Sequence, residues 1–279
     1  MKLKEEGDKV VIEYAYAKVN LTLNVLAKKD GYHEIETIMA PIDLCDILTF
    51  EESDSLEVIG LDIENNSIIK AAQLFMATYH TPPCKITVEK NIPIEAGLGG
   101  GSADSSATLR GMNRLFNLKK SYFELEKLAN QLGSDNAFCL YNKLAICRGR
   151  GEKLEFIKKP FIYHLLLIKP NFGLSTKLVY ENVDIKPDRI DSYEMLKIIN
   201  DYHEFDNKIV NDLFDSAIKL DFRMKSLYDK IKAEGFVPHM TGSGSCFFVL
   251  LKRERLDLES IEKIFEGNFI KLCLIKNCF

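Results

Sequence analysis

A glycine-rich segment places the strongest constraint on how this chain can fold. Between a predicted strand and a predicted helix it comprises Pro93, Ile94, Glu95, Ala96, Gly97, Leu98, Gly99, Gly100, Gly101, Ser102 and Ala103. Consecutive glycines let the backbone turn sharply and approach a ligand without Cβ contacts. The helix that follows presents unpaired N–H groups and the positive end of its dipole, which attract anions. The sequence therefore predicts an anion-binding loop, and the alternative is a tight turn that binds no ligand.

Two common phosphate-binding motifs do not fit this loop. It has no Gly-Lys-Ser/Thr ending, which excludes a P-loop. The sixth position from Gly97 is Ser102 rather than glycine, and no βαβ unit opens here, which excludes the dinucleotide fingerprint. Ser102, Ser105 and Ser106 add hydroxyl donors near the start of the helix, and they favour a phosphate ligand.

An early strand is predicted by strict alternation over residues 18–25. One face carries the apolar side chains Val19, Leu21, Leu23 and Val25. The other face carries the polar side chains Lys18, Asn20, Thr22 and Asn24. A polar face of this kind fits either a solvated strand or a functional site. The Asp30-Gly31 pair that follows predicts a turn.

Short strands and helices occur in both halves of the chain, which predicts an α+β fold. The second half has helical patterns over residues 175–183, 191–200, 207–220 and 222–234. At about 150 residues per domain, 279 residues predict two domains. The best candidate linker is Lys158-Lys159-Pro160, so the predicted domains span residues 1–158 and 159–279.

Charge and cysteine content exclude several classes of protein. Lys plus Arg is 37 and Asp plus Glu is 41, so the net charge is 37 − 41 = −4, which argues against a broad nucleic-acid surface. The seven scattered cysteines include no C-x-x-C pair, which argues against a disulfide framework or a zinc ribbon. There is no apolar signal core, and the longest apolar stretch, 161–168, is too short to span a membrane. We therefore expect a cytoplasmic protein that binds neither nucleic acid nor membrane.

The glycine-rich segment resembles the phosphate-binding motif of the GHMP kinases, a family named for galactokinase and for homoserine, mevalonate and phosphomevalonate kinases. Further resemblances follow in family order along the chain. They are Ala17-Lys18-Val19-Asn20-Leu21, Asp30-Gly31-Tyr32-His33, Gly133-Ser134-Asp135, Asn211-Asp212-Leu213 and Met240-Thr241-Gly242-Ser243-Gly244. The shared order is more specific than any single motif. The sequence departs from the family pattern at Ser134, at Asn136-Ala137 and within Ser102-Ala103-Asp104-Ser105-Ser106. None of these departures removes a titrating group.

The resemblance implies a two-domain α+β fold with the active site in the cleft between domains. It implies an ATP-dependent kinase that uses Mg²⁺, since this ion bridges phosphate oxygens. The triple glycine followed by Ser-x-Asp is similar to members that phosphorylate the 2-hydroxyl of 4-diphosphocytidyl-2-C-methyl-D-erythritol in non-mevalonate isoprenoid biosynthesis. The alternatives are a homoserine- or mevalonate-type kinase, or a nucleotide-binding module without catalysis. The sequence shows no carboxylate cluster that would hold the metal alone, and Ser102 is a candidate ligand.

By the same resemblance, two residues form the catalytic unit. Asp135 is the base for the substrate hydroxyl, and Lys18 keeps Asp135 ionised and offsets charge during transfer. On the residues alone, Asp135 could instead cap the next helix, and Lys18 could lie on a solvated strand face.

The resemblance also implies an acceptor site. Tyr32 and Tyr180 would stack on the two faces of the cytosine, and His33 would pair with its edge. The remaining predicted substrate-binding residues are Asn20, Thr176, Gly242 and Ser243. The structural alternatives are a core position for Tyr180, a surface turn for His33 and a tight turn for residues 242–244.

Overall fold

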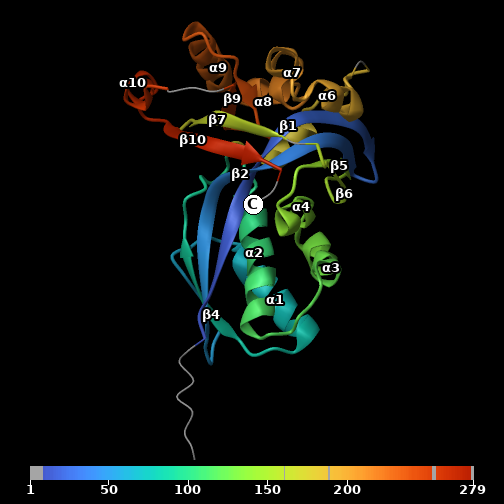
Figure 1. Ribbon diagram of the computed structural model, residues 1–279, viewed down its shortest axis with the longest axis vertical. Coiled ribbons are helices and arrows are strands. Elements are labelled where there is room, and N and C mark those ends of the chain that lie inside the picture. Colours follow the sequence, from blue (N-terminus) through green and yellow to red (C-terminus); the bar gives the residue numbers. More distant parts are fainter. Residues whose placement is uncertain (1–8, 160, 188, 253–255, 278–279) are drawn as a thin grey trace, which may run out of the picture. The chain divides into compact units, whose positions relative to one another are not determined.

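A computed structural model describes residues 9–159, 161–187, 189–252 and 256–277 (Figure 1). Helices combined with largely antiparallel strand pairs confirm the predicted α+β class. The strands are β1 (Val11–Lys29), β2 (Tyr32–Glu52), β3 (Glu57–Ile59), β4 (Cys84–Glu89), β5 (Ala145–Gly149), β6 (Lys153–Phe156), β7 (Ile162–Lys169), β8 (His239–Met240), β9 (Phe247–Leu251) and β10 (Phe269–Lys276). The helices are α1 (Ser67–Tyr79), α2 (Gly100–Leu115), α3 (Tyr122–Leu132), α4 (Asn136–Tyr141), α5 (Thr176–Glu181), α6 (Ser192–Ile198), α7 (Tyr202–Lys208), α8 (Phe214–Leu220), α9 (Arg223–Ala233) and α10 (Leu258–Ile264).

The chain forms two compact units that are interleaved along the sequence. Unit 1 comprises residues 1–17, 44–92 and 100–141, and unit 2 comprises residues 18–43, 93–99 and 142–279. The long strands β1 and β2 contribute residues to both. The predicted domains, in contrast, are two continuous segments that meet between residues 158 and 159. This division stays a prediction, because packing contacts do not measure whether a segment folds independently. Pro160 of the predicted linker lies outside the described residues.

Unit 1 combines a small sheet with helices. Strand β4 pairs with β2 in antiparallel fashion and with β3 in parallel fashion. Helix α1 packs along α2, as Figure 1 shows. In the sequence, Asn66 precedes apolar residues at helical spacing, which predicts a helix cap. The structure confirms it, because the Asn66 side chain accepts a hydrogen bond from the N–H of Ile68 at 2.9 Å. The spacing of Ser121 and Glu124 predicts a capping box, and this is present at the start of α3.

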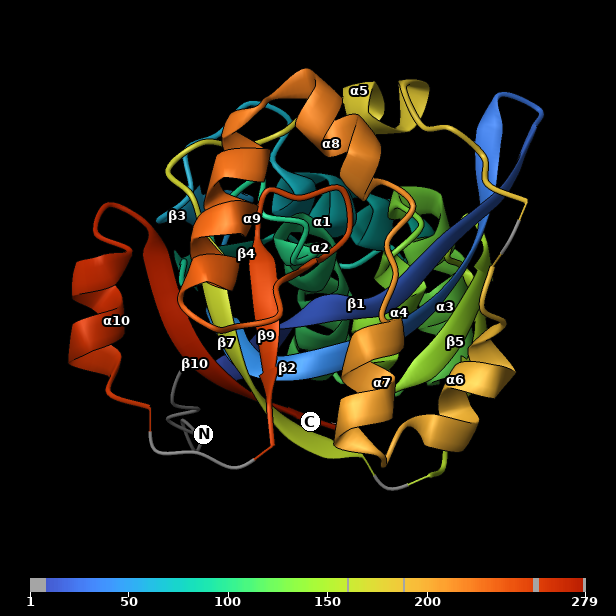
Figure 2. The ribbon, with the colours of Figure 1, turned by 90° about the horizontal axis from the view of Figure 1, so that it is seen from above.

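Unit 2 is built on a sheet in which β2, β10, β7, β9 and β8 follow one another. Strands β1 and β5 also pair with β2, and β6 pairs with β5. Strand β10 pairs with the whole of β7, which in turn pairs with β9 (Figure 2). The predicted turn at Asp30-Gly31 is confirmed, and both residues have positive φ. The turn separates β1 from β2, and Tyr32 is the first residue of β2.

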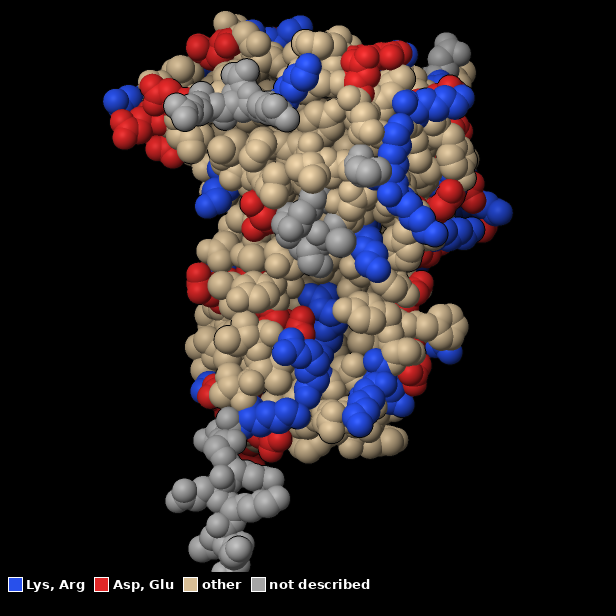
Figure 3. Space-filling view, in the orientation of Figure 1, with Lys and Arg blue, Asp and Glu red and all other residues tan. Residues whose placement is uncertain are grey.

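Charged side chains of both signs occur on the face that Figure 3 presents. On the face that Figure 3 presents, small groups of Lys and Arg and small groups of Asp and Glu are separated by uncharged side chains. In the part of the chain that the structure describes, no helix is long and apolar enough to cross a membrane. No disulfide joins the six cysteines of that part, and Cys278 lies outside it.

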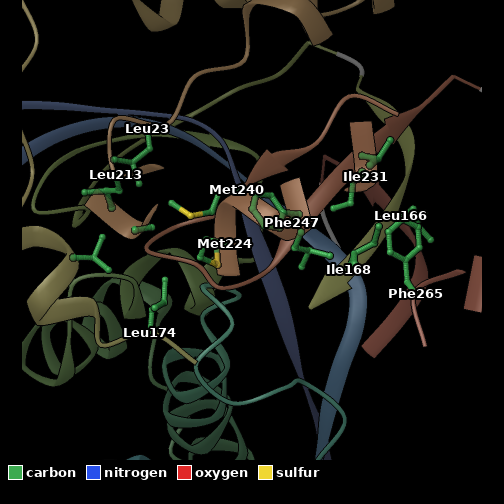
Figure 4. Close-up of a cluster of buried hydrophobic side chains, with 14 of the residues drawn as sticks. Leu23, Leu166, Ile168, Leu174, Leu213, Met224, Ile231, Met240, Phe247 and Phe265 are labelled. Atoms are coloured by element: carbon green, nitrogen blue, oxygen red, sulfur yellow. The ribbon is translucent and has the colours of Figure 1, made fainter. Parts of the chain in front are cut away.

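The core of unit 2 lies between its sheet and the helices α8 and α9. The buried side chains shown in Figure 4 include Leu166 and Ile168 of β7, Phe247 of β9 and Met224 and Ile231 of α9. Each is fully buried. Burying a side chain of this size contributes about 1.5–3 kcal/mol, so this cluster fixes the helices against the sheet.

One predicted helix is wrong. The pattern over residues 207–220 predicted a continuous helix, whereas α7 ends at Lys208 and α8 begins at Phe214. Between them the Asn211 amide donates hydrogen bonds to backbone carbonyl oxygens near residue 241, and the Asp212 carboxylate accepts one from the backbone of β1. These tertiary bonds outweigh local helix propensity, which is a weak determinant for single residues.

Candidate active site

The polar face of β1 is buried. Lys18 is 4% exposed and Asn20 is 3% exposed, so the alternative of a solvated strand face is wrong. The Asn20 amide donates to Thr37 Oγ1 at 2.9 Å, and Thr37 in turn donates to the carbonyl oxygen of Thr22. Buried polar groups cost free energy unless they are hydrogen-bonded, and this chain of bonds between β1 and β2 satisfies them.

The Lys18 ammonium group is tied to the glycine-rich loop. It donates to Asn20 Oδ1 at 2.6 Å and to the carbonyl oxygen of Gly97 at 3.0 Å. The Lys18 backbone N–H also donates to the carbonyl oxygen of Leu98 at 3.0 Å. A buried cation needs such partners, and here the partners place its positive charge directly against the loop.

The turn around Thr241 holds the loop from another direction. Thr241 Oγ1 accepts the backbone N–H of Asn20 at 3.0 Å and donates to the Gly97 carbonyl oxygen at 3.3 Å. The N–H groups of Ser245 and Cys246 donate to the carbonyl oxygens of Glu95 and Ala96. Gly97 has a φ of +72°, and a Cβ there would lie 2.2 Å from the Thr241 carbonyl oxygen. Only glycine fits this contact.

The structure brings three further predicted residues to the same region of unit 2. A Cβ at Gly242 would lie 3.3 Å from Lys18 Nζ, so this turn approaches the lysine closely. The Asn211 amide donates to the Gly242 carbonyl oxygen at 2.9 Å, which fixes the turn. The hydroxyl oxygens of Thr176 and Ser243 lie 2.8 Å apart and share a hydrogen bond.

Two of the predicted base-binding residues, His33 and Tyr180, contact each other. The rings of His33 and Tyr180 are in contact, with centroids 5.4 Å apart and planes inclined by 35°. Burial, together with the nearby Lys28, lowers the pKa of His33 below its ordinary value. Tyr32 is 58% exposed and its ring lies under the Arg150 guanidinium group, 4.7 Å away. A neutral His33 offers both a donor and an acceptor nitrogen.

In unit 1 the helix α2 begins at Gly100, two residues earlier than predicted. A Cβ at Gly100 would lie 3.3 Å from Lys90 Nζ, so a second lysine stands at the start of this helix. Lys90 donates to Asp104 Oδ2 at 2.9 Å and also to Asp46. Ser105 donates to the carbonyl oxygen of Gly101 at 3.0 Å, which uses the hydroxyl proton that was predicted to face a ligand.

Two buried carboxylates share the single charge of Lys90. Asp46 Oδ1 also accepts the N–H groups of Asn91 and Ile92, at 2.6 and 2.7 Å. Asp104 has no such bonds, and its Oδ1 is buried with no hydrogen-bond partner among the described residues. Burial therefore raises the pKa of Asp104, Lys90 offsets part of the rise, and Asp46 adds to it.

Asp135 lies in the predicted turn. It follows Gly133, which caps α3, and it is half-buried immediately before α4. Its carbonyl oxygen accepts the N–H of Cys139 at 3.0 Å. Asp135 belongs to unit 1 and Lys18 to unit 2. The proposed pairing of the two side chains therefore stays a prediction.

Several residues of the site were not singled out from the sequence. Thr37, Thr241 and Asn211 organise the surroundings of Lys18, and Asp46 holds Lys90. Thr241 and Asn211 did lie within recognised motifs, but a hydroxyl or an amide gives no sign in the sequence of its bonding partner. Among the described residues, no group of three or more His, Cys, Asp or Glu side chains could hold a metal ion.

Comparisons with known proteins found a matching family model, similar sequences and similar structures. A family model described as the GHMP kinases N terminal domain matches residues 66–143. A Staphylococcus haemolyticus protein provisionally named 4-diphosphocytidyl-2-C-methyl-D-erythritol kinase is 40% identical over 88% of this chain and 92% of its own length. A crystal structure of 4-(cytidine 5'-diphospho)-2C-methyl-D-erythritol kinase superposes with a TM-score of 0.83, at 30% identity, over 95% of this chain and 99% of that one. A homoserine kinase from Cytophaga hutchinsonii shares the fold, with a TM-score of 0.71 at 16% identity over 100% of this chain and 98% of that one.

Proposed function

This chain belongs to the GHMP kinase family, and on that premise we propose that it phosphorylates the 2-hydroxyl group of 4-diphosphocytidyl-2-C-methyl-D-erythritol with ATP. The reaction is a step in non-mevalonate biosynthesis of isoprenoid precursors. The observation that carries the proposal is the buried Lys18 ammonium group held against Gly97 of the glycine-rich loop. A strand with no function would not need a buried cation beside a backbone carbonyl group.

The residues of the loop and its surroundings fit a nucleoside triphosphate. The loop is held at Gly97 by Thr241 and Lys18, so its backbone is fixed before a ligand arrives. Helix α2 begins directly after the loop, and its first N–H groups suit phosphate oxygens. Mg²⁺ supplies charge neutralisation of the phosphates when it is bound with ATP. Ser102 is the candidate protein ligand for it, and bound phosphates would provide the rest.

The catalytic chemistry falls to two side chains. The oxygen of the substrate hydroxyl group attacks the γ-phosphoryl group of ATP, and ADP leaves. Asp135 accepts the proton that this hydroxyl group loses. Lys18 stabilises the negative charge that develops during transfer. Phosphoryl transfer depends mostly on positioning, which agrees with the number of bonds that hold Lys18.

The acceptor is positioned by residues of unit 2. Tyr32, His33 and Tyr180 would recognise the cytosine by stacking and by hydrogen bonds to its edge. The hydroxyl groups of Thr176 and Ser243, with the backbone at Gly242, would bind the polar remainder of the substrate. Asn20, whose amide already supports Lys18, would orient the reacting end.

A homoserine- or mevalonate-type acceptor is the first alternative, and a nucleotide-binding module without catalysis is the second. The likeness to homoserine kinase is one of fold alone. The contact between His33 and Tyr180 favours an acceptor that carries a base, because an aliphatic acceptor has no ring to stack. A cytoplasmic location remains part of the proposal.

The proposal is tested by incubating the purified full-length chain with ATP, Mg²⁺ and the cytidyl substrate. Mass spectrometry should find a product heavier by one phosphoryl group, with one ADP formed per product. Phosphorus NMR should place the new phosphate on the 2-hydroxyl group. ADP release without a phosphorylated product would instead indicate hydrolysis of ATP. ATP binding without any ADP release would support a nucleotide-binding module without catalysis.

A further inference from the structure

Glu95 of the glycine-rich loop adopts a backbone conformation that favours glycine. Its φ is +52°, in the left-handed region, where a side chain is crowded by its own backbone. Gly97 and Gly99, further along the loop, have a φ of +72° each and carry no side chain. A residue with a side chain stays in such a conformation only where its surroundings hold it there. The proposed kinase reaction gives the side chain of Glu95 no role.

The Glu95 side chain lies directly against Gly173, in the segment that joins β7 to α5. A Cβ at Gly173 would lie 2.5 Å from Glu95 Cβ and 2.9 Å from Glu95 Cδ. Carbon atoms pack at about 3.5–4.0 Å, so the contact leaves no room for a side chain on Gly173. Rotation of the Glu95 side chain cannot relieve the clash, because the backbone fixes its Cβ. The φ of Gly173 lies outside the left-handed region, so the contact is what requires glycine there.

The segment around Gly173 is firmly anchored. The carbonyl oxygen of Phe172 accepts hydrogen bonds from Lys169 Nζ at 3.0 Å and from Ser245 Oγ at 2.6 Å, and both donors belong to buried residues. The side chain of Leu174 is part of the buried hydrophobic cluster of unit 2. A methyl group added at Gly173 would therefore displace the glycine-rich loop rather than the segment itself.

The loop backbone at Glu95 leads directly to the glycine that Lys18 contacts. The N–H group of Ser245 donates to the Glu95 carbonyl oxygen at 3.3 Å, and that of Cys246 donates to the next carbonyl oxygen of the loop at 3.2 Å. The residue after that is Gly97, which accepts a hydrogen bond from the Lys18 ammonium group. All of these residues belong to unit 2. A shift of Glu95 would therefore stretch these bonds and move the backbone that Lys18 contacts.

We propose that Gly173 is a positioning residue for the glycine-rich loop. Its bare Cα receives the Glu95 side chain and thereby sets the position of the loop backbone that binds the phosphates of ATP. This role depends on the proposed function only in that ATP is taken as the ligand of the loop. The segment continues into α5, which carries Thr176 and Tyr180 of the proposed acceptor site. One stretch of chain therefore positions both the nucleotide loop and residues for the acceptor.

The first test is a calorimetric titration of the purified full-length chain with ATP and Mg²⁺, without an acceptor. Gly173→Ala should raise the Kd for ATP at least about tenfold, because a loop displaced by about 1 Å no longer matches the phosphates. Asn171→Ala is the matched control, because Asn171 is exposed in the same segment, and the Kd should then be unchanged. An unchanged Kd for a folded Gly173→Ala variant would overturn the proposal.

The second test is rescue by removal of the Glu95 side chain. Glu95→Gly takes away the atoms that the new methyl group would meet, and glycine suits the φ of +52°. Adding Gly173→Ala to Glu95→Gly should therefore change the Kd for ATP by less than about threefold relative to Glu95→Gly alone. The same loss of affinity in both backgrounds would contradict a role through Glu95. If Gly173→Ala alone does not fold, the double variant should fold, and a double variant that also fails to fold would overturn the proposal.

The third test needs no nucleotide. Hydrogen exchange of the Ser245 and Cys246 amide groups reports the position of the loop, because both donate to loop carbonyl oxygens. Exchange at both should be faster in Gly173→Ala than in the unmodified chain, and in the double variant it should match Glu95→Gly alone. Unchanged exchange in a folded Gly173→Ala variant would overturn the proposal. If the unmodified chain binds no ATP, the proposed function fails, and the exchange result alone then decides the role of Gly173.

Discussion

The Lys18 ammonium nitrogen lies 3.0 Å from the carbonyl oxygen of Gly97 and donates a hydrogen bond to it. This bond links a buried residue of β1 to a loop 79 positions later in the chain. The positive charge and the backbone that should receive phosphate are therefore positioned by the same contact. The proposed kinase activity depends on this arrangement of the lysine and the loop.

Replacing either proposed catalytic residue should abolish most turnover. Lys18→Met should lower kcat by about 10²–10³-fold, because charge stabilisation is lost from the transition state. Asp135→Asn should lower kcat by about 10²–10⁴-fold, because the base is lost. ATP binding, measured by calorimetry, should persist in both. Lys263→Met, on an exposed position of α10, is the matched control and should leave kcat unchanged. Near-normal turnover of either variant would contradict the assignment.

Gly97→Ala should weaken ATP binding through a steric clash. The new Cβ would lie 2.2 Å from the Thr241 carbonyl oxygen, so the loop must move. The φ of +72° adds strain of about 1–2 kcal/mol. Gly235→Ala separates the two effects, because Gly235 has a φ of +83° but no described atom lies within 4 Å of its Cβ. Thermal unfolding should show a loss of stability for both, whereas the KM for ATP should rise only for Gly97→Ala.

Asp104 should make stability depend on pH. Burial raises the pKa of Asp104 to about 7 in the folded protein, so the folded state binds this proton more tightly than the unfolded state. The free energy of unfolding therefore falls as the pH rises from about 4 to about 7. Asp104→Asn removes this contribution, so its Tm relative to the unmodified protein should be higher at pH 8 than at pH 5. An equal difference in Tm at both pH values would show that the pKa of Asp104 is not raised by its burial.

Tyr180→Ala should weaken binding of the cytidyl substrate without affecting ATP. Loss of one stacked base contact costs about 1–3 kcal/mol, which corresponds to about 5- to 150-fold in KM. Tyr180→Phe keeps the ring and should retain most of the affinity. Phe222→Ala removes an aromatic side chain that is 74% exposed and serves as the control. If the KM of Tyr180→Ala for the cytidyl substrate is unchanged, Tyr180 does not bind the substrate and its ring only packs in the core.

Local patterns predicted much of the fold. The alternation over residues 18–25, the cap at Asn66 and the capping box at Ser121 depend on neighbouring residues, and all are present. The break between α7 and α8 was missed because Asn211 bonds to Met240 and Gly242, which lie far away in sequence. No local pattern records such a partner.

The site was predicted from motifs and only partly from physical chemistry. The polar face of β1 looked equally suited to solvent, and its burial depends on Thr37 and Thr241 covering Asn20. The role of Asp46 was invisible because a single Asp in a strand gives no indication that it will accept two backbone N–H groups and Lys90.

The preferred acceptor is the most direct test of the proposed function. A coupled assay of ADP release should be run with the 4-diphosphocytidyl-2-C-methyl-D-erythritol substrate, homoserine and mevalonate at matched concentrations. We expect kcat/KM for the cytidyl substrate to exceed that for either aliphatic acceptor by at least about 10²-fold, because only this substrate can use Tyr32, His33 and Tyr180. Turnover of homoserine or mevalonate with none of the cytidyl compound would contradict the proposed function and leave only the family.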